Sequence, residues 1–137
     1  MTSYQIIDEP KLKSYQHLIV DPILILFISF IVPIFWAPPL YGKFWIPVCW
    51  ILTNGFLLGS PTYKQELIIA IIGSSLFIGI LFGFIHMASI NALMIDTKVA
   101  APYVGIIINS FFFLTMYIIV FKQAAPYSIF QYIKENK

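Results

Sequence analysis

The sequence predicts an all-α fold, a polytopic integral membrane protein in which four transmembrane helices form a bundle with short interfacial segments at both ends. Of its 137 residues, 60% are hydrophobic and only 10% are charged, whereas soluble domains carry about 25% charged residues. The mean hydropathy is +0.89. Residues 67–90 contain no Asp, Glu, Lys or Arg. As a helix they would span roughly 36 Å, more than the ~30 Å hydrocarbon core of a bilayer.

The first predicted span covers residues 19–36. Asp21 precedes Pro22, and this pair is typical of a helix start, because Asp caps free backbone N–H groups and Pro is tolerated at the first helical position. Pro33 is expected to kink or end the helix. Residues 11–18 carry apolar side chains at helical spacing, which leaves open a short interfacial helix or an unstructured tail.

The second predicted span, residues 40–58, is less regular than the others. Pro47 lies near its start, and Asn54 and Gly55 lie near its end. A helix that crosses fully and a re-entrant or tilted helix both remain open. Three aromatic residues surround the loop before this span, as expected at a membrane–water interface: Trp36, Tyr41 and Trp45.

The remaining two spans are predicted at residues 67–90 and 101–121. Turn-forming residues 59–62 precede the third span, Pro102 falls in the first turn of the fourth, and Lys122 marks its end. Residues 126–137 are expected to form an interfacial helix. All four spans can pack against one another, so residues 1–137 are predicted to form a single membrane domain.

The distribution of lysines predicts the orientation. With four spans, six lysines share the side of both termini: Lys11, Lys13, Lys64, Lys122, Lys134 and Lys137. The opposite side has only Lys43 and Lys98. The positive-inside rule therefore places both termini in the cytoplasm, in a cell membrane such as the bacterial inner membrane.

Small residues recur at four-residue steps, where they allow two helices to approach closely in lipid. In the third span these residues are Ser75, Gly79 and Gly83, and in the fourth span Ala101, Gly105 and Asn109 lie at the same step. Two interpretations remain open. The small residues pack against a partner subunit, or they pack against a neighbouring helix of the same chain.

Three polar residues are expected to form polar contacts within the membrane: His86, Asn109 and Asn54. An unpaired amide in hydrocarbon costs several kcal/mol, so each should have a partner. His86 and Asn109 fall at similar depth and are expected to face a common polar spot. His86 is a neutral hydrogen-bonded residue, a proton-linked or solute-contacting group, or a haem ligand. The only second histidine, His17, lies on the opposite side.

Several kinds of chemistry have no support in the sequence. It contains no pair of carboxylates for acid–base catalysis, no His/Cys cluster at metal spacing, no Ser/His/Asp set at one depth and no Walker loop. No buried acidic residue is expected for cation-coupled transport. The sequence therefore predicts no enzyme, no cofactor and no metal. The absence of arginine argues against nucleic-acid binding.

The hypothesis that follows is a small non-catalytic membrane protein that contacts another integral membrane protein, or itself, within the lipid bilayer. It would be an accessory or assembly subunit, or an immunity-type inhibitor. In general character the composition is similar to that of small bacterial immunity proteins against pore-forming toxins, and this likeness transfers no residues. One alternative is a small oligomeric channel or transporter whose path is lined by His86, Asn109 and Asn54. Another is an anchor subunit of a redox complex.

Overall fold

The computed structural model describes residues 15–38 and 41–135, and this part of the chain contains helices and no strand. Its elements are η1 (Gln16–Leu18), α1 (Pro22–Ile31), η2 (Pro33–Phe35), η3 (Tyr41–Lys43), α2 (Trp45–Leu58), α3 (Tyr63–Ser89) and α4 (Thr97–Glu135). The prefix η marks short 3-10 helices. The prediction of an all-α fold is confirmed for the described residues.

Helix α1 begins and ends where its sequence requires. The Asp21 side chain accepts a hydrogen bond from the backbone N–H of Ile23 at 2.8 Å, so the predicted cap is present. The helix stops at Ile31, and Pro33 opens the 3-10 turn η2, because a proline in the helix interior would remove a backbone hydrogen bond. The Trp36 indole N–H donates to the carbonyl of Phe30 and folds this turn back onto α1.

Two helices, α3 and α4, are long and apolar enough to cross a membrane. At 1.5 Å per residue they measure about 40 and 58 Å, whereas α1 and α2 measure about 15 and 21 Å, shorter than the ~30 Å hydrocarbon core. The membrane-spanning length predicted at residues 67–90 and 101–121 is therefore present. For residues 19–36 and 40–58 the structure gives shorter helices joined by 3-10 turns, so helix length alone does not support four complete crossings.

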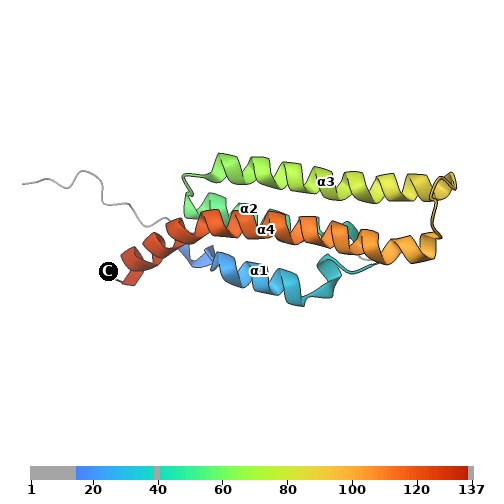
Figure 1. Cartoon of the computed structure of the whole chain (residues 1–137). Helices are drawn as coiled ribbons and strands as arrows, with labels where there is room; N and C mark the ends of the chain where they lie inside the picture. The colour runs from blue at the N-terminus through green and yellow to red at the C-terminus, as the bar shows by residue number, and fades with distance from the viewer. Residues whose placement is uncertain (1–14, 39–40, 136–137) are drawn as a thin grey trace, which may run out of the picture.

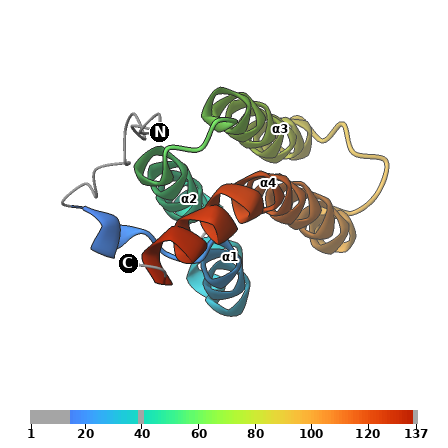
Figure 2. The ribbon, with the colours of Figure 1, turned by 90° about the vertical axis from the view of Figure 1, so that its left-hand side faces the viewer.

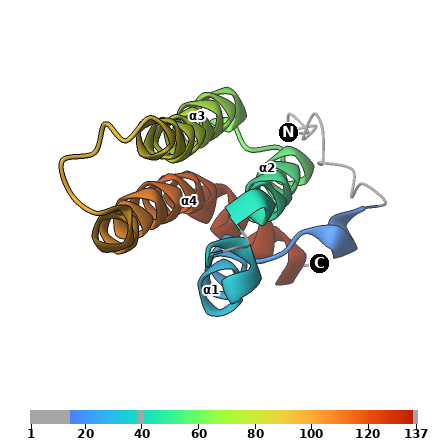
Figure 3. The ribbon, with the colours of Figure 1, turned by 90° about the vertical axis from the view of Figure 1, so that its right-hand side faces the viewer.

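Helices α3 and α4 lie side by side, and α1 and α2 form a hairpin beside them that turns back before the far end of α3 (Figure 1). Views along the bundle show α4 between α3 and α1, with α2 beside both α3 and α4 (Figure 2 and Figure 3). Helix α4 contacts α1, α2 and α3, and its most extensive contact is with α3. It is therefore the helix on which the others are assembled.

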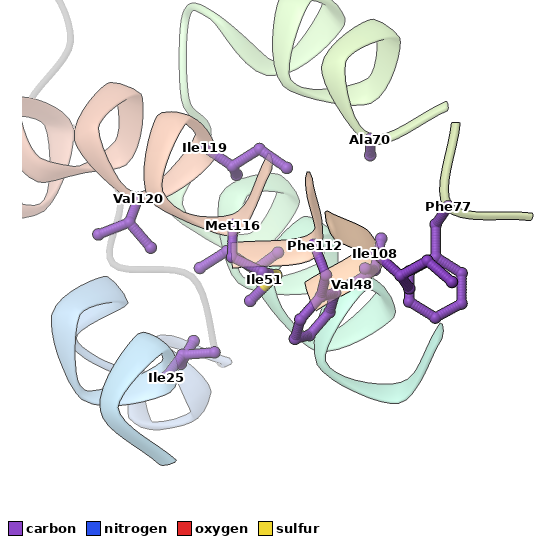
Figure 4. Packing of buried hydrophobic residues seen from close by; sticks show 10 residues of the cluster. All are labelled: Ile25, Val48, Ile51, Ala70, Phe77, Ile108, Phe112, Met116, Ile119 and Val120. Carbon is purple, nitrogen blue, oxygen red and sulfur yellow. The ribbon is translucent and has the colours of Figure 1, made fainter. Parts of the chain in front are cut away.

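Apolar side chains from all four helices form the core (Figure 4). The buried members are Ile25, Val48, Ile51, Ala70, Phe77, Ile108, Phe112, Met116, Ile119 and Val120. The Phe44 and Phe77 rings stack with their centroids 4.1 Å apart, which joins the start of α2 to α3. Gly73 lets α3 approach α4 closely, because a Cβ at this position would collide with the Thr115 side chain.

The C-terminal segment differs from the prediction. The sequence predicts a span over residues 101–121 and a separate interfacial helix over residues 126–137, but α4 runs on without interruption to Glu135 with Pro126 inside it. Proline lacks a backbone N–H and commonly bends a helix, and α4 bends near its C-terminal end (Figure 1). At the other end, residues 16–18 of the proposed interfacial helix form the turn η1, and residues 11–14 lie outside the described residues.

Candidate functional site

A buried polar cluster lies where the loop between α2 and α3 meets α4. Its centre is Glu66, in the first turn of α3, whose relative exposure is 0%. Its Oε1 accepts hydrogen bonds from the hydroxyls of Ser60 at 2.5 Å and Thr62 at 2.8 Å. Its Oε2 accepts one from the Gln123 side-chain amide at 2.8 Å. Both carboxyl oxygens are therefore bonded within the chain.

Gln123 and Asn54 extend this network to α1 and α2. The Gln123 amide N–H also donates to the backbone carbonyl of Ile51 at 2.9 Å, and its Oε1 accepts from Asn54 Nδ2 at 3.2 Å. The Asn54 Oδ1 accepts from the backbone N–H of Val20 at 2.8 Å. Four segments are thus joined: the residues before α1, α2, the start of α3, and α4. Asn54, Glu66 and Gln123 define what we call the buried network.

Gly55 provides the space that the buried network needs. A Cβ at this position would collide with the Gln123 amide nitrogen and with Glu66 Oε2. Glycine lowers helix stability by about 1 kcal/mol relative to alanine, and here that cost is offset by two side-chain groups lying directly on the backbone of α2. The sequence pair Asn54–Gly55 therefore has a packing reason: Asn54 supplies hydrogen bonds and Gly55 supplies room.

The buried network holds helices together and is closed to substrates. Glu66 and Gln123 are 0% exposed and Asn54 is 2% exposed. The nearby cation Lys122 donates to the Gln65 side chain at 2.8 Å and does not pair with Glu66. Buried polar groups cost free energy unless they are hydrogen-bonded, and the side-chain oxygens and nitrogens of the three network residues all have partners. The arrangement is suited to fixing the positions of helices in an apolar bundle.

Sequence reasoning missed Glu66, and the expectation that the chain holds no buried acidic residue is wrong. The predicted third span begins at residue 67 and leaves Glu66 just outside it, whereas α3 begins at Tyr63. The Ser60 and Thr62 hydroxyls bond the Glu66 side chain and not the free backbone N–H groups of the first turn, so the spacing does not match a capping box. No sequence pattern marked Gln123 as a buried residue, because it directly follows Lys122, which was predicted to lie at the end of the span.

The predicted small residues of α3 do not lie against the rest of the chain. Ser75, Gly79 and Gly83 are exposed, and a Cβ at either glycine would meet nothing within 4 Å. Helix α3 packs on α4 through a different side, which includes Ala70, Gly73 and Phe77. Gly105 of α4 is half-buried and does not face the α3 stripe. It lines a pocket of about 420 Å³ with Pro38, Lys98, Ala101, Pro102, Ile106 and Asn109.

The structure does not bring the three predicted polar residues together. His86 is exposed near the C-terminal end of α3, and among the described side chains no hydrogen bond joins it to Asn109. The Asn109 Oδ1 is buried without a hydrogen-bond partner beside the 420 Å³ pocket. Asn54 belongs to the buried network near the opposite end of α3. Each residue therefore has a separate environment.

Within residues 15–38 and 41–135, no group of three or more His, Cys, Asp or Glu side chains lies together as a metal site would require. Comparisons with protein-family models, with curated proteins and with solved structures gave no match to this chain.

Proposed function

We propose that this chain is a small, non-catalytic integral membrane protein that acts through helix–helix contacts with another membrane protein or with a second copy of itself. It would serve as an accessory or assembly subunit, or as an immunity-type inhibitor. The observation that carries this proposal is the uncovered stripe formed by Ser75, Gly79 and Gly83 on α3.

The stripe supports the proposal because small residues let two backbones approach within the bilayer, where packing and interhelical hydrogen bonds drive association. In this chain, no neighbouring helix packs against the α3 stripe. In the most apolar 18-residue window of each long helix, 11% of α3 residues are buried, compared with 33% of α4 residues. Helix α3 is therefore the long helix with the most surface left for a partner.

The proposed membrane arrangement has α3 and α4 as complete spans, with the α1–α2 hairpin entering beside them. The α1–α2 hairpin would cross the whole bilayer only if the 3-10 turns η2 and η3 add to the length of α1 and α2. In both cases the residues before α1, the α2–α3 loop and the end of α4 lie on one side. That side carries Lys64, Lys122 and Lys134, so the positive-inside rule favours its cytoplasmic location.

The channel alternative has less support. A path would need polar residues around a wet cavity, but His86, Asn109 and Asn54 lie apart. The space where α2, α3 and α4 meet, lined by Phe44, Gly73, Phe77 and Thr115 among others, holds about 10 Å³. This volume is at the lower limit for a single water molecule. A haem-anchoring role has less support still, because one exposed histidine does not supply two axial ligands.

The test is association at native expression in a mild detergent. Gly79→Leu combined with Gly83→Leu should abolish co-purification of the partner, or self-association, while the monomer folds normally, because both positions face open space. The control is Ile85→Phe, an exposed apolar position on α3 that lies about a third to half a turn away from both glycines. The proposal fails if the double variant keeps the same association, or if the wild-type protein emerges alone and conducts ions in liposomes.

A further inference from the structure

The end of the bundle where α3 passes into α4 carries an apolar surface. Met94, in the loop between the two helices, is fully exposed, and four apolar neighbours are between 46% and 62% exposed. We call these five residues the apolar tip: Met87, Ile90, Met94, Ile95 and Val99. The α1–α2 hairpin turns back before this end (Figure 1). We propose that the apolar tip is embedded in the membrane interface, with its side chains among lipid acyl chains. The proposal rests on the membrane arrangement proposed above.

The length of α3 favours this placement. At the opposite end of the helix Lys64 is exposed and Lys122 donates to Gln65, so polar groups mark the membrane boundary there. The uncharged residues 67–90 that follow measure roughly 36 Å as a helix, about 6 Å more than the ~30 Å hydrocarbon core. A helix with such an excess commonly tilts. A tilted pair of α3 and α4 keeps the apolar tip in contact with lipid.

The apolar tip continues the exposed apolar surface of both long helices. Phe82 and Ile85 on α3, and Tyr103 and Ile106 on α4, are each more than half exposed within the proposed spans. Residues 67–95 contain no Asp, Glu, Lys or Arg, so no charged residue separates the surface of α3 from the loop. Because the surface is continuous and uncharged, the partner that it fits is the same hydrocarbon that surrounds the spans.

The backbone at the end of α3 is hydrogen-bonded within the chain, as a segment that approaches lipid requires. Asn91 has a left-handed φ of 53°, a conformation that asparagine tolerates better than most residues. Its N–H donates to the carbonyl of Ala88 at 3.3 Å, and the N–H of Ala92 donates to the carbonyl of Met87 at 3.0 Å. This is the Schellman arrangement. It satisfies two carbonyls that would otherwise need water.

The start of α4 is closed in a similar way. The Asp96 carboxylate accepts from the N–H of Lys98 at 2.8 Å, and the Asp96 carbonyl accepts from the N–H groups of Val99 and Ala100. The exposed Lys98 has a long apolar stem that lets its ammonium reach lipid headgroups. The backbone of residues 93–95 then lies at headgroup depth, where water is present, and only the side chains of the apolar tip enter the acyl region.

The test places a nitroxide label on single cysteines in a Cys49→Ser background, in phosphatidylcholine vesicles without other proteins. Met94→Cys reports the apolar tip, Phe82→Cys is the reference for lipid, and Lys64→Cys is the reference for water. Collisions of the label with oxygen, which concentrates in lipid, are compared with collisions with a water-soluble nickel complex. The label at Met94→Cys should resemble the one at Phe82→Cys more closely than the one at Lys64→Cys.

Substitution of Met94 gives a second readout that needs no label. Because Met94 is fully exposed, neither Met94→Glu nor Met94→Leu removes packing within the chain, and a difference between them reports the surroundings. Met94→Glu should unfold at a lower temperature than the wild type in the same vesicles, because a carboxylate is costly in lipid. Met94→Leu should unfold near the wild-type temperature. Gln131→Glu, at an exposed position of α4, is the matched control and should have no effect.

The outcomes separate this proposal from the one on which it rests. The embedding of the apolar tip is overturned if the nickel complex reaches the label at Met94→Cys as readily as the label at Lys64→Cys, or if Met94→Glu and Met94→Leu are equally stable. In that case Phe82→Cys still reports lipid, and the proposed spans stand. If the label at Phe82→Cys is itself in water, the membrane arrangement is wrong and this proposal falls with it.

Discussion

The side-chain amide of Gln123 lies between Glu66 Oε2 at 2.8 Å and the carbonyl of Ile51 at 2.9 Å and donates a hydrogen bond to each. These acceptors belong to α3 and α2, 57 and 72 positions away in sequence. One residue of α4 therefore fixes the relative positions of two other helices.

Gln123→Leu should destabilise the folded chain by roughly 2–3 kcal/mol, because it leaves Glu66, Asn54 and the Ile51 carbonyl with fewer partners in a buried site. Denaturant unfolding in mild detergent measures the change. Gln131→Leu is the control, since Gln131 is exposed on the same helix, and it should change stability by less than about 0.5 kcal/mol. Equal effects of the two substitutions would contradict a central role for Gln123.

Gly55→Ala should lower stability by roughly 1–3 kcal/mol, although alanine is the better helix former, because its Cβ forces Gln123 and Glu66 away from α2. Gly79→Ala is the matched control in α3, where the added Cβ meets nothing. There the substitution should be neutral or stabilising by up to about 1 kcal/mol. We therefore expect the unfolding midpoint of the monomer to fall in Gly55→Ala and to stay the same or rise in Gly79→Ala.

Asp21→Ala should cost about 1 kcal/mol, because it removes the acceptor that caps the N–H of Ile23 at the start of α1. Asp21→Asn should retain most of this stability, since Asn caps a helix about as well as Asp. Hydrogen exchange of the first turn of α1 would locate the effect. If both substitutions cost the same, the carboxylate charge matters more than the cap.

Cysteine labelling in a Cys49→Ser background should place Lys64→Cys and Lys98→Cys on opposite sides of the membrane, because α3 lies between them and has the length to cross. Lys43→Cys, at the turn of the α1–α2 hairpin, reports how far the hairpin reaches. If Lys43→Cys is labelled from the same side of the membrane as Lys98→Cys, the hairpin crosses completely. If the reagent labels Lys43→Cys from neither side, the hairpin is re-entrant. Labelling of Lys64→Cys and Lys98→Cys from the same side would contradict the proposed spans.

The helices that are defined by apolar composition and by residues that start or end a helix could be predicted from the sequence. A long uncharged stretch predicted α3, and Asp21, Pro22 and Pro33 predicted where α1 begins and ends. The merger of the last two segments into α4 could not be predicted in the same way, because Pro126 and Lys122 are typical helix-ending signals. The buried residues of α4 end at Gln123, so packing in the core does not explain why the helix continues past Pro126.

The contacts between helices were not predictable from the sequence. The spacing of Gly79 and Gly83 favoured a packing face, but the glycines that lie against neighbouring helices are Gly55 and Gly73. Periodicity shows which residues share a face, and it does not show which face meets which neighbour. Asn54 was expected to have a hydrogen-bond partner, and its partners come from residues 34 and 69 positions away.

The position of Gln123 after Asn54 and Glu66 in the chain has a consequence for biosynthesis. Proteins are made from the N-terminus, and early segments fold first, so α1, α2 and the start of α3 leave the ribosome well before Gln123. Until it arrives, the Glu66 carboxyl and the Asn54 amide each lack one of their bonds. The nascent chain must therefore keep these groups in contact with water, with lipid headgroups or with the insertion machinery, and the bundle can close only after α4 has been translated.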